Sequence, residues 1–210
     1  MLILNVGAGD CRIQSPDWLN IDQLRSYFPV DNPEHGYLNS RLDNEPNYVD
    51  MDIALPWWPG QHPGETAERF DACVICHVLE HFDVPGALHI LREIHRCLKP
   101  GGVLRITVPD ASYFRRVYPE DRRENWARLF EPFNDTSDNQ TYLQVALFFE
   151  QHLAVHSEDT MWCMLVMAGF RPDGITRVGP GESRTGNPAG QAMVIMDTRP
   201  LFSLHCECVK

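Results

Sequence analysis

An apolar run, a helical repeat and a second apolar run follow one another in the middle of the chain. Residues 70–76 have the composition of a strand that is covered on both faces. Residues 85–98 place apolar side chains at helical spacing, and a Pro-Gly-Gly sequence ends this predicted helix before a second buried strand at residues 103–108. A strand, a helix and a strand in this order form a right-handed crossover, which predicts a parallel sheet in an α/β domain.

Shorter patterns on either side extend the predicted sheet. The last of these patterns, at residues 201–209, alternates polar and apolar side chains, which suits a closing antiparallel strand. A further helix is predicted at residues 157–168, with Ser157 as its N-cap. The additional strands are predicted at residues 2–6, 18–21, 48–50, 175–178 and 201–209.

Length and charge fit one soluble domain spanning residues 1–210. The 18 Lys and Arg against 29 Asp and Glu give a net charge of −11, which argues against a nucleic-acid or anionic-membrane partner. No apolar run approaches the ~20 residues that cross a bilayer, and the first residues do not resemble an export signal, so a cytoplasmic location is expected. The seven cysteines are expected to be reduced core residues.

Small and acidic residues follow the first three predicted strands. Gly7 and Gly9 permit a tight turn and a close ligand, while Asp22 could accept hydrogen bonds from two ribose hydroxyls. Asp50 could accept from an adenine amino group. Taken alone, the glycines are equally explained by a plain turn, and each aspartate is better explained as a solvated carboxylate. The carboxyl ends of parallel strands, however, meet at one edge of the sheet and bind ligands there. A dinucleotide fingerprint would need glycine at Arg12, which favours a ligand without a pyrophosphate.

Five segments together resemble one family. "LNVGAGD", "LNID", "VDMDIALPW", "RFDACVICHVLEHF" and "LKPGGVLRITVPD" follow in an order similar to that of class I S-adenosylmethionine-dependent methyltransferases. The resemblance spans about residues 2–110 and includes the last helix and strands. It implies a Rossmann-like three-layer sandwich whose seven-stranded, mostly parallel sheet has the order 3-2-1-4-5-7-6, with strand 7 antiparallel.

The resemblance also implies a binding site for S-adenosylmethionine, which leaves as S-adenosylhomocysteine. The glycine turn after the first strand would face the methionine part of the cofactor, and the end of the second strand would face the ribose. The end of the third strand would lie by the adenine, and the end of the fourth strand would lie near the sulfonium. Where the family usually has an acidic residue before the glycines, this chain has Asn5, which brings no charge. The implied cofactor-binding residues are Asn5, Gly7, Ala8, Gly9, Asp22, Asp50, Met51, Cys76 and His77.

The acceptor is expected to be a small hydroxyl-bearing or sugar-like molecule, by analogy with the family. Residues 111–155 fit no compact core element and are expected to form the acceptor wall or lid. His152 and His156, four positions apart, could share a helical face near the acceptor. A general base would help an O-directed transfer. The candidates are His77, Tyr113, His152 and His156.

Two other functions stay open from the sequence. One is a protein that binds the cofactor but is catalytically silent. The other is a zinc hydrolase, because His77, Glu80 and His81 match the pattern H-x-x-E-H. That mechanism needs one helix through both histidines, whereas His77 is predicted to end a strand. No metal ligand set is therefore predicted, and the closely spaced cysteines are interpreted as core residues.

Overall fold

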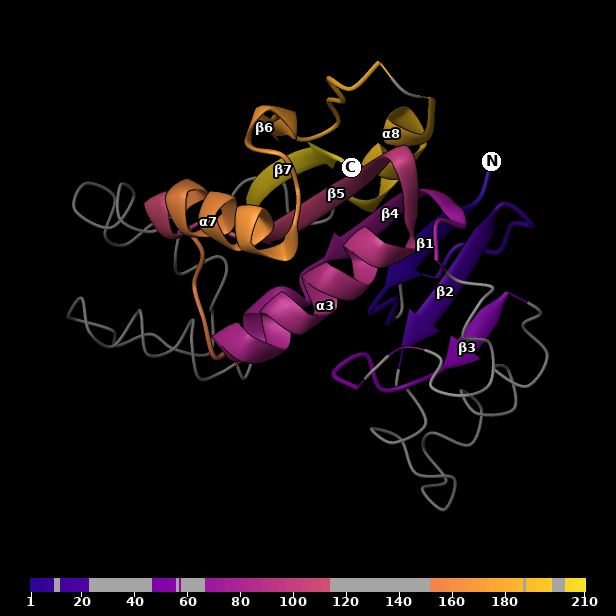
Figure 1. The fold of residues 1–210 in the computed structure, drawn as a ribbon, viewed down its shortest axis with the longest axis horizontal. Helices are drawn as coiled ribbons and strands as arrows, with labels where there is room; N and C mark the ends of the chain where they lie inside the picture. Colours follow the sequence, from indigo (N-terminus) through magenta and orange to yellow (C-terminus); the bar gives the residue numbers. More distant parts are fainter. Residues whose placement is uncertain are drawn as a thin grey trace, which may run out of the picture.

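The computed structural model gives a single mixed sheet with the predicted strand order, β3-β2-β1-β4-β5-β7-β6 (Figure 1). β1 to β5 run parallel to their neighbours, and β7 is antiparallel to both β5 and β6. The strands are β1 (Ile3–Val6), β2 (Trp18–Asp22), β3 (Tyr48–Asp50), β4 (Phe70–Cys76), β5 (Leu98–Pro109), β6 (Ile175–Val178) and β7 (Ser203–Val209). The structure describes residues 1–9, 12–22, 47–55, 57, 67–113, 152–186, 188–197 and 203–210.

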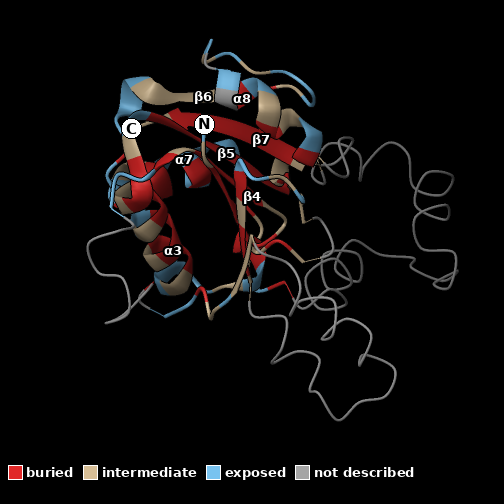
Figure 2. Cartoon of the chain, turned by 90° about the vertical axis from the view of Figure 1, so that its right-hand side faces the viewer, coloured by how far each residue is buried: buried red, intermediate tan, exposed pale blue. Residues whose placement is uncertain are grey.

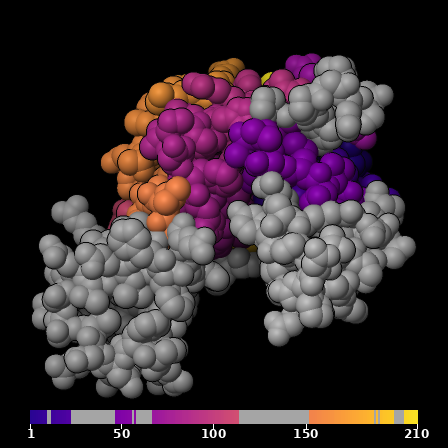
Figure 3. All heavy atoms as spheres, turned by 90° about the horizontal axis from the view of Figure 1, so that it is seen from below, coloured from indigo at the N-terminus to yellow at the C-terminus, as the bar shows by residue number. Residues whose placement is uncertain are grey.

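Helices cover both faces of this sheet. α3 (Val84–Cys97) and α7 (Glu158–Ala168) lie side by side on one face, as Figures 1, 2 and 3 show. α8 (Pro188–Met193) and the 3-10 helix η3 (Val194–Met196) pack on β4 and β5 from the other side. Two shorter 3-10 helices, η1 (Leu79–His81) and η2 (Pro172–Gly174), complete the described elements.

Successive side chains of each central strand point alternately into two apolar cores, one on each face of the sheet, which accounts for the three layers. Leu4 packs into the core under α3 and α7, whereas its neighbour Ile3 packs into the smaller core under α8. Cys73 and Val74 divide between the two cores in the same way. Because successive side chains of a strand point to opposite faces, both faces must be covered. Figure 2 shows the central strands as buried.

The two long helices end where their sequences favour it. The Asp83 side chain caps α3 by accepting from the amide of Gly86 at 2.9 Å. Ser157 and Thr160 form a reciprocal capping box at the start of α7, and Gly169 ends that helix at φ +109°. The predicted helix at residues 157–168 is therefore confirmed.

The structure changes three details of the sequence prediction. β5 begins at Leu98 instead of residue 103, because Leu98 already pairs with Phe70 ahead of an irregularity in the ladder. α8, which begins at Pro188, was not among the predicted helices. The polar side chains of His205 and Glu207 on β7 are buried, because His205 lies by Asp197 and Glu207 pairs with a buried arginine described below. Most of the predicted insertion, residues 114–151, lies outside the described residues.

Among the described residues, no helix combines the length and the apolar character needed to cross a bilayer.

Candidate active site

The two glycines after β1 have different surroundings. Gly7 has φ +65°, and a Cβ there would lie 2.4 Å from Cγ2 of Val78, so the chain needs glycine for this close packing. Gly9 has φ +45°, but a Cβ there would have no neighbour within 4 Å. The amides of Gly7 and Ala8 both donate to the carbonyl of Ile21, which fixes the turn against β2. The turn thus leaves open space beside Gly9.

Asp22 joins this turn to the end of β3. Its Oδ2 accepts a hydrogen bond from the Gly9 amide at 2.6 Å. Asp22 stands opposite Asp50 in the parallel register, and the Met51 amide donates to the Asp22 carbonyl at 2.9 Å. The Tyr48 hydroxyl donates to the same carbonyl at 2.9 Å. The structure therefore brings the predicted strand-end residues together at one edge of the sheet.

Asn5 has a structural role that the sequence did not reveal. Its side chain is 1% exposed, and its Nδ2 donates to Oδ1 of Asn20 at 3.0 Å. Asn20 in turn accepts from the Ile13 amide and donates to the carbonyls of Ile13 and Asn47. This buried amide network links β1 to the segments that flank β2. A contact of Asn5 with the cofactor stays a prediction.

His77 follows β4 in a conformation that is uncommon for a non-glycine residue. Its φ is +53°, and its amide donates to the Thr107 carbonyl at 2.8 Å. The ring lies between two polar side chains, with Nδ1 3.1 Å from Oε1 of Glu80 and Nε2 3.0 Å from Oγ of Ser203. Glu80 is fully buried. The imidazole is therefore held firmly at the end of β4, with one nitrogen facing the start of β7.

A cleft of about 470 Å³ lies where β5, β6 and β7 meet at this edge. Its wall includes Ser203, which contacts His77, so the cleft borders the end of β4. Arg177 lines it and pairs with the buried Asp110 at 3.1 Å. Sequence reasoning identified only one of its polar residues, Tyr113. The polar residues that line the cleft are Asp110, Tyr113, Arg177, Glu182, Arg184, Ser203 and His205.

A buried arginine supports the wall of this cleft. Arg105 is 0% exposed and forms ion pairs with Asp197 at 2.5 Å and Glu207 at 2.8 Å. It also donates to the carbonyl of Glu182 at 2.9 Å. Burial alone would raise the pKa of Asp197, but hydrogen bonds from His205, Arg105 and the Gly181 amide hold it well below the usual value. Asp197 is therefore a stable counter-charge.

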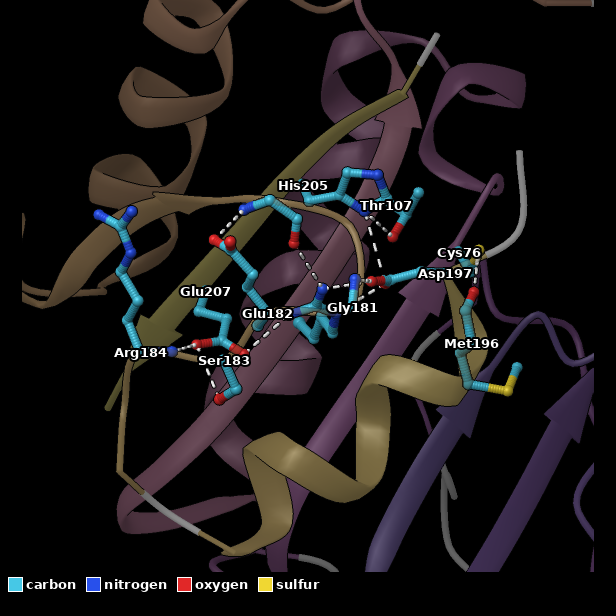
Figure 4. A network of polar contacts seen from close by, with 12 residues as sticks. Cys76, Thr107, Gly181, Glu182, Ser183, Arg184, Met196, Asp197, His205 and Glu207 are labelled. Atoms are coloured by element: carbon cyan, nitrogen blue, oxygen red, sulfur yellow. Dashed lines mark hydrogen bonds and ion pairs between the residues drawn. The ribbon is translucent and has the colours of Figure 1, made fainter. Parts of the chain in front are cut away.

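The same network fixes the loop at residues 179–184. Oε2 of Glu207 accepts from the Arg184 amide at 2.9 Å and from the Ser183 hydroxyl at 3.2 Å (Figure 4). The Gly181 amide donates to Asp197 at 2.6 Å. Because this loop lines the cleft, the ion network determines the position of one of its walls.

His152 and His156 lie beside η1, but not on a helix as expected. The backbone of this segment is extended and docks on Glu80, whose carbonyl accepts from the Leu153 amide at 2.7 Å. The His152 ring meets the ring of His81 edge-on at 4.8 Å. Burial lowers the pKa of His156, and the nearby Glu80 carboxylate opposes part of this effect. The prediction that His152 and His156 share a helical face was wrong, because this segment forms backbone hydrogen bonds to η1 instead of a helix.

The helix required by the inverted zinc-protease mechanism is not formed. His77 ends β4 with a positive φ, whereas Glu80 and His81 belong to the short helix η1. The next α-helix, α3, begins only at Val84. His77 and His81 therefore do not stand one turn apart on a continuous helix, and the zinc-hydrolase alternative loses its geometric basis.

The described cysteines are free thiols, and among them Cys163 on α7 is exposed, so the expected core position is wrong there. Burial raises the pKa of Cys97 to about 11 and that of Cys206 to about 12. Cys73 is buried in the larger core, and the Cys76 thiol donates to the Met196 carbonyl at 3.0 Å (Figure 4). The interpretation of the strand cysteines as packed residues is confirmed for these positions.

Comparison with known proteins identifies the family. A family model described as a methyltransferase domain matches residues 22–173. A SAM-dependent methyltransferase from Archaeoglobus fulgidus is similar in fold, with a TM-score of 0.52, 13% identity, and coverage of 99% of this chain and 85% of that one. A Thermotoga maritima protein described as a SAM-dependent methyltransferase and possible histamine N-methyltransferase has a TM-score of 0.53 and 13% identity, with coverage of 100% of this chain and 82% of that one. YcgJ of Bacillus subtilis has a TM-score of 0.50 and 14% identity, with coverage of 99% of this chain and 91% of that one.

A search of curated protein sequences found no significant match. The family match covers most of the chain, and the strand order described above agrees with it. The chain therefore belongs to the methyltransferase-domain family and is a class I enzyme that uses S-adenosylmethionine as its methyl donor.

Proposed function

We propose that this methyltransferase transfers its methyl group to a hydroxyl of a small, polar, sugar-like acceptor bound in the cleft between β5, β6 and β7. The observation that carries the proposal is the contact between Ser203, in the wall of that cleft, and His77 at the end of β4. Charged side chains such as Arg177 and Arg184 line the cleft, which favours a polar acceptor over an apolar one.

The cofactor would bind along the carboxyl ends of β1 to β4. The open space beside Gly9 would take the methionine part, and the Asp22 carboxylate the ribose hydroxyls. Asp50 and Met51 would lie by the adenine. The sulfonium would then point toward Cys76 and His77.

The chemistry is an in-line displacement. The acceptor oxygen forms a bond to the methyl carbon while the carbon–sulfur bond breaks, and neutral S-adenosylhomocysteine leaves. Orientation of two bound reactants can contribute ~7–11 kcal/mol to the lowering of the barrier. Of the four candidate bases, His77 has the best position, because Glu80 holds its Nδ1 and its Nε2 faces the cleft wall. It would receive the hydroxyl proton.

The insertion at residues 111–155 is part of the proposal as an acceptor wall. Its described ends meet, because Asp110 and His156 form a parallel bridge and the Ala111 amide donates to the His156 carbonyl at 2.9 Å. The chain thus leaves and rejoins the fold at one place, beside Tyr113 in the cleft. The cytoplasmic location also stays a prediction, and the oligomeric state is open.

Methyl transfer from labelled S-adenosylmethionine tests the acceptor. We expect label to enter a small, polar fraction of a metabolite extract as an alkali-stable ether. Label on nitrogen or carbon would overturn the O-directed assignment. Binding of S-adenosylhomocysteine without transfer to any fraction would instead favour the catalytically silent alternative.

Replacement of Asp22 by Ala tests the ribose contact. We expect cofactor binding to weaken by about 1.5–3 kcal/mol, the contribution of a hydrogen bond to a charged group. Calorimetric titration with S-adenosylhomocysteine measures this loss. Asp17→Ala is the matched control, because Asp17 is an exposed carboxylate just before the opposite end of β2. An unchanged dissociation constant in Asp22→Ala would remove this residue from the site.

A further inference from the structure

A carboxylate and two histidines converge beside η1. Glu80 and His81 lie on this short helix, and His152 lies near the end of the insertion at residues 111–155. One ligand atom from each of the three lies within 4.8 Å of the other two. The rings of His81 and His152 meet at a centroid distance of 4.8 Å.

Glu80 is the least expected member of this group, because its side chain is 0% exposed. One carboxylate oxygen, Oε1, lies 3.1 Å from Nδ1 of His77. The other, Oε2, is buried and has no hydrogen-bond partner among the described residues. Nε2 of His156 nearby is also buried without a partner. A buried carboxylate is costly unless it is fully paired or binds a cation, so the cluster has the character of an incomplete ligand site.

We propose that Glu80, His81 and His152 bind one divalent first-row transition-metal ion, such as Zn²⁺ or Co²⁺. Two imidazole nitrogens and one carboxylate oxygen are a ligand set that these ions prefer. Bonds of about 2.1 Å to a common ion require ligand atoms about 3.4 Å apart, so small rotations of the end groups complete the site. The exposed side chain of His81 can make such a rotation.

The surroundings support this assignment. His77 lies against Oε1 of Glu80 and orients the carboxylate, as groups around metal ligands commonly do. Backbone hydrogen bonds from Leu153 and Ala154 to the Glu80 carbonyl, 2.7 and 3.1 Å long, already hold the His152 segment in place. Three protein ligands would leave a coordination position open for water or an acceptor oxygen.

The site differs from the one suggested by the H-x-x-E-H pattern. His77 is engaged by Glu80 and Ser203, and His152 replaces it as the third ligand. The ion would therefore bridge η1 to the far end of the insertion, which no spacing in the sequence indicates. It would also lie one side chain away from His77, beside the proposed acceptor cleft.

Metal titration of tag-free, chelator-treated protein tests the proposal. We expect Co²⁺ to bind at one ion per chain with visible absorption bands, and Zn²⁺ to displace it. Glu80→Gln, His81→Ala and His152→Ala should each weaken binding by at least the roughly 10–100-fold that loss of a supporting residue costs. His89→Ala is the control, because His89 lies on α3 and bonds to the Leu55 carbonyl.

Two outcomes would overturn the site: no stoichiometric ion in the wild-type protein, or undiminished binding in His152→Ala. His81→Ala is the cleanest variant, since the His81 side chain is exposed and its loss should leave the core intact. Binding of S-adenosylhomocysteine, measured in the same samples, reports separately on folding and on the methyl-donor site. Failure of the metal site is therefore distinguishable from failure of the proposed acceptor chemistry.

Discussion

Gly9→Val is expected to abolish cofactor binding in a protein that stays folded. Gly9 has φ +45°, which costs a β-branched residue about 1–3 kcal/mol, but its Cβ would meet no atom of the described residues within 4 Å. The new side chain would instead fill the space proposed for the methionine part. We expect the dissociation constant for S-adenosylhomocysteine to rise on the order of 100-fold or more, equivalent to about 2.7 kcal/mol, by calorimetry.

Gly101→Val separates the steric block from backbone strain. Gly101 also has a positive φ, +76°, and also lacks any neighbour within 4 Å of an added Cβ. It lies near the amino end of β5, at the opposite edge of the sheet from Gly9. Both variants should lose similar stability in chemical denaturation, while only Gly9→Val loses the cofactor. Equal loss of binding in both, or wild-type binding in Gly9→Val, would contradict the assigned pocket.

The cofactor half could be predicted because it depends on local sequence and on one property of parallel sheets. Strand ends are marked by residues next to them, and parallel strands bring those ends to one edge. Gly9, Asp22 and Asp50 needed no further information to be placed together, and the structure joins them through one hydrogen bond and one register pair. Asn5 was harder, because its partner Asn20 shows no pattern in the sequence.

The acceptor half could not be predicted, because no single segment contains it. The cleft takes Asp110 from after β5, Arg177 from β6 and Ser203 from β7. Each residue has an ordinary local context, and only the antiparallel return of β7 brings them together. The buried Glu80 illustrates the same limit. Its pattern with the neighbouring histidines was visible, but its third candidate partner, His152, arrives by tertiary packing.

Arg105→Met is expected to destabilise the fold by about 3–5 kcal/mol, because it leaves two buried carboxylates without their counter-charge. Asp197 and Glu207 are almost fully buried and both pair with this guanidinium. Methionine fills a similar length of side chain, so the loss should come from charge rather than from a cavity. Urea denaturation gives the change in free energy of unfolding.

Two comparisons identify the cause of that loss. Arg171→Ala breaks the exposed pair with Asp173 and should leave the free energy of unfolding almost unchanged, because solvent screens exposed charges. Combining Arg105→Met with Asp197→Asn and Glu207→Gln should restore part of the stability, since no unpaired charge remains. If Arg105→Met alone costs as little as Arg171→Ala, the buried network does not stabilise the fold. Because this network positions the loop at residues 179–184 but not the glycine turn, the folded variants should keep cofactor affinity and lose methyl transfer.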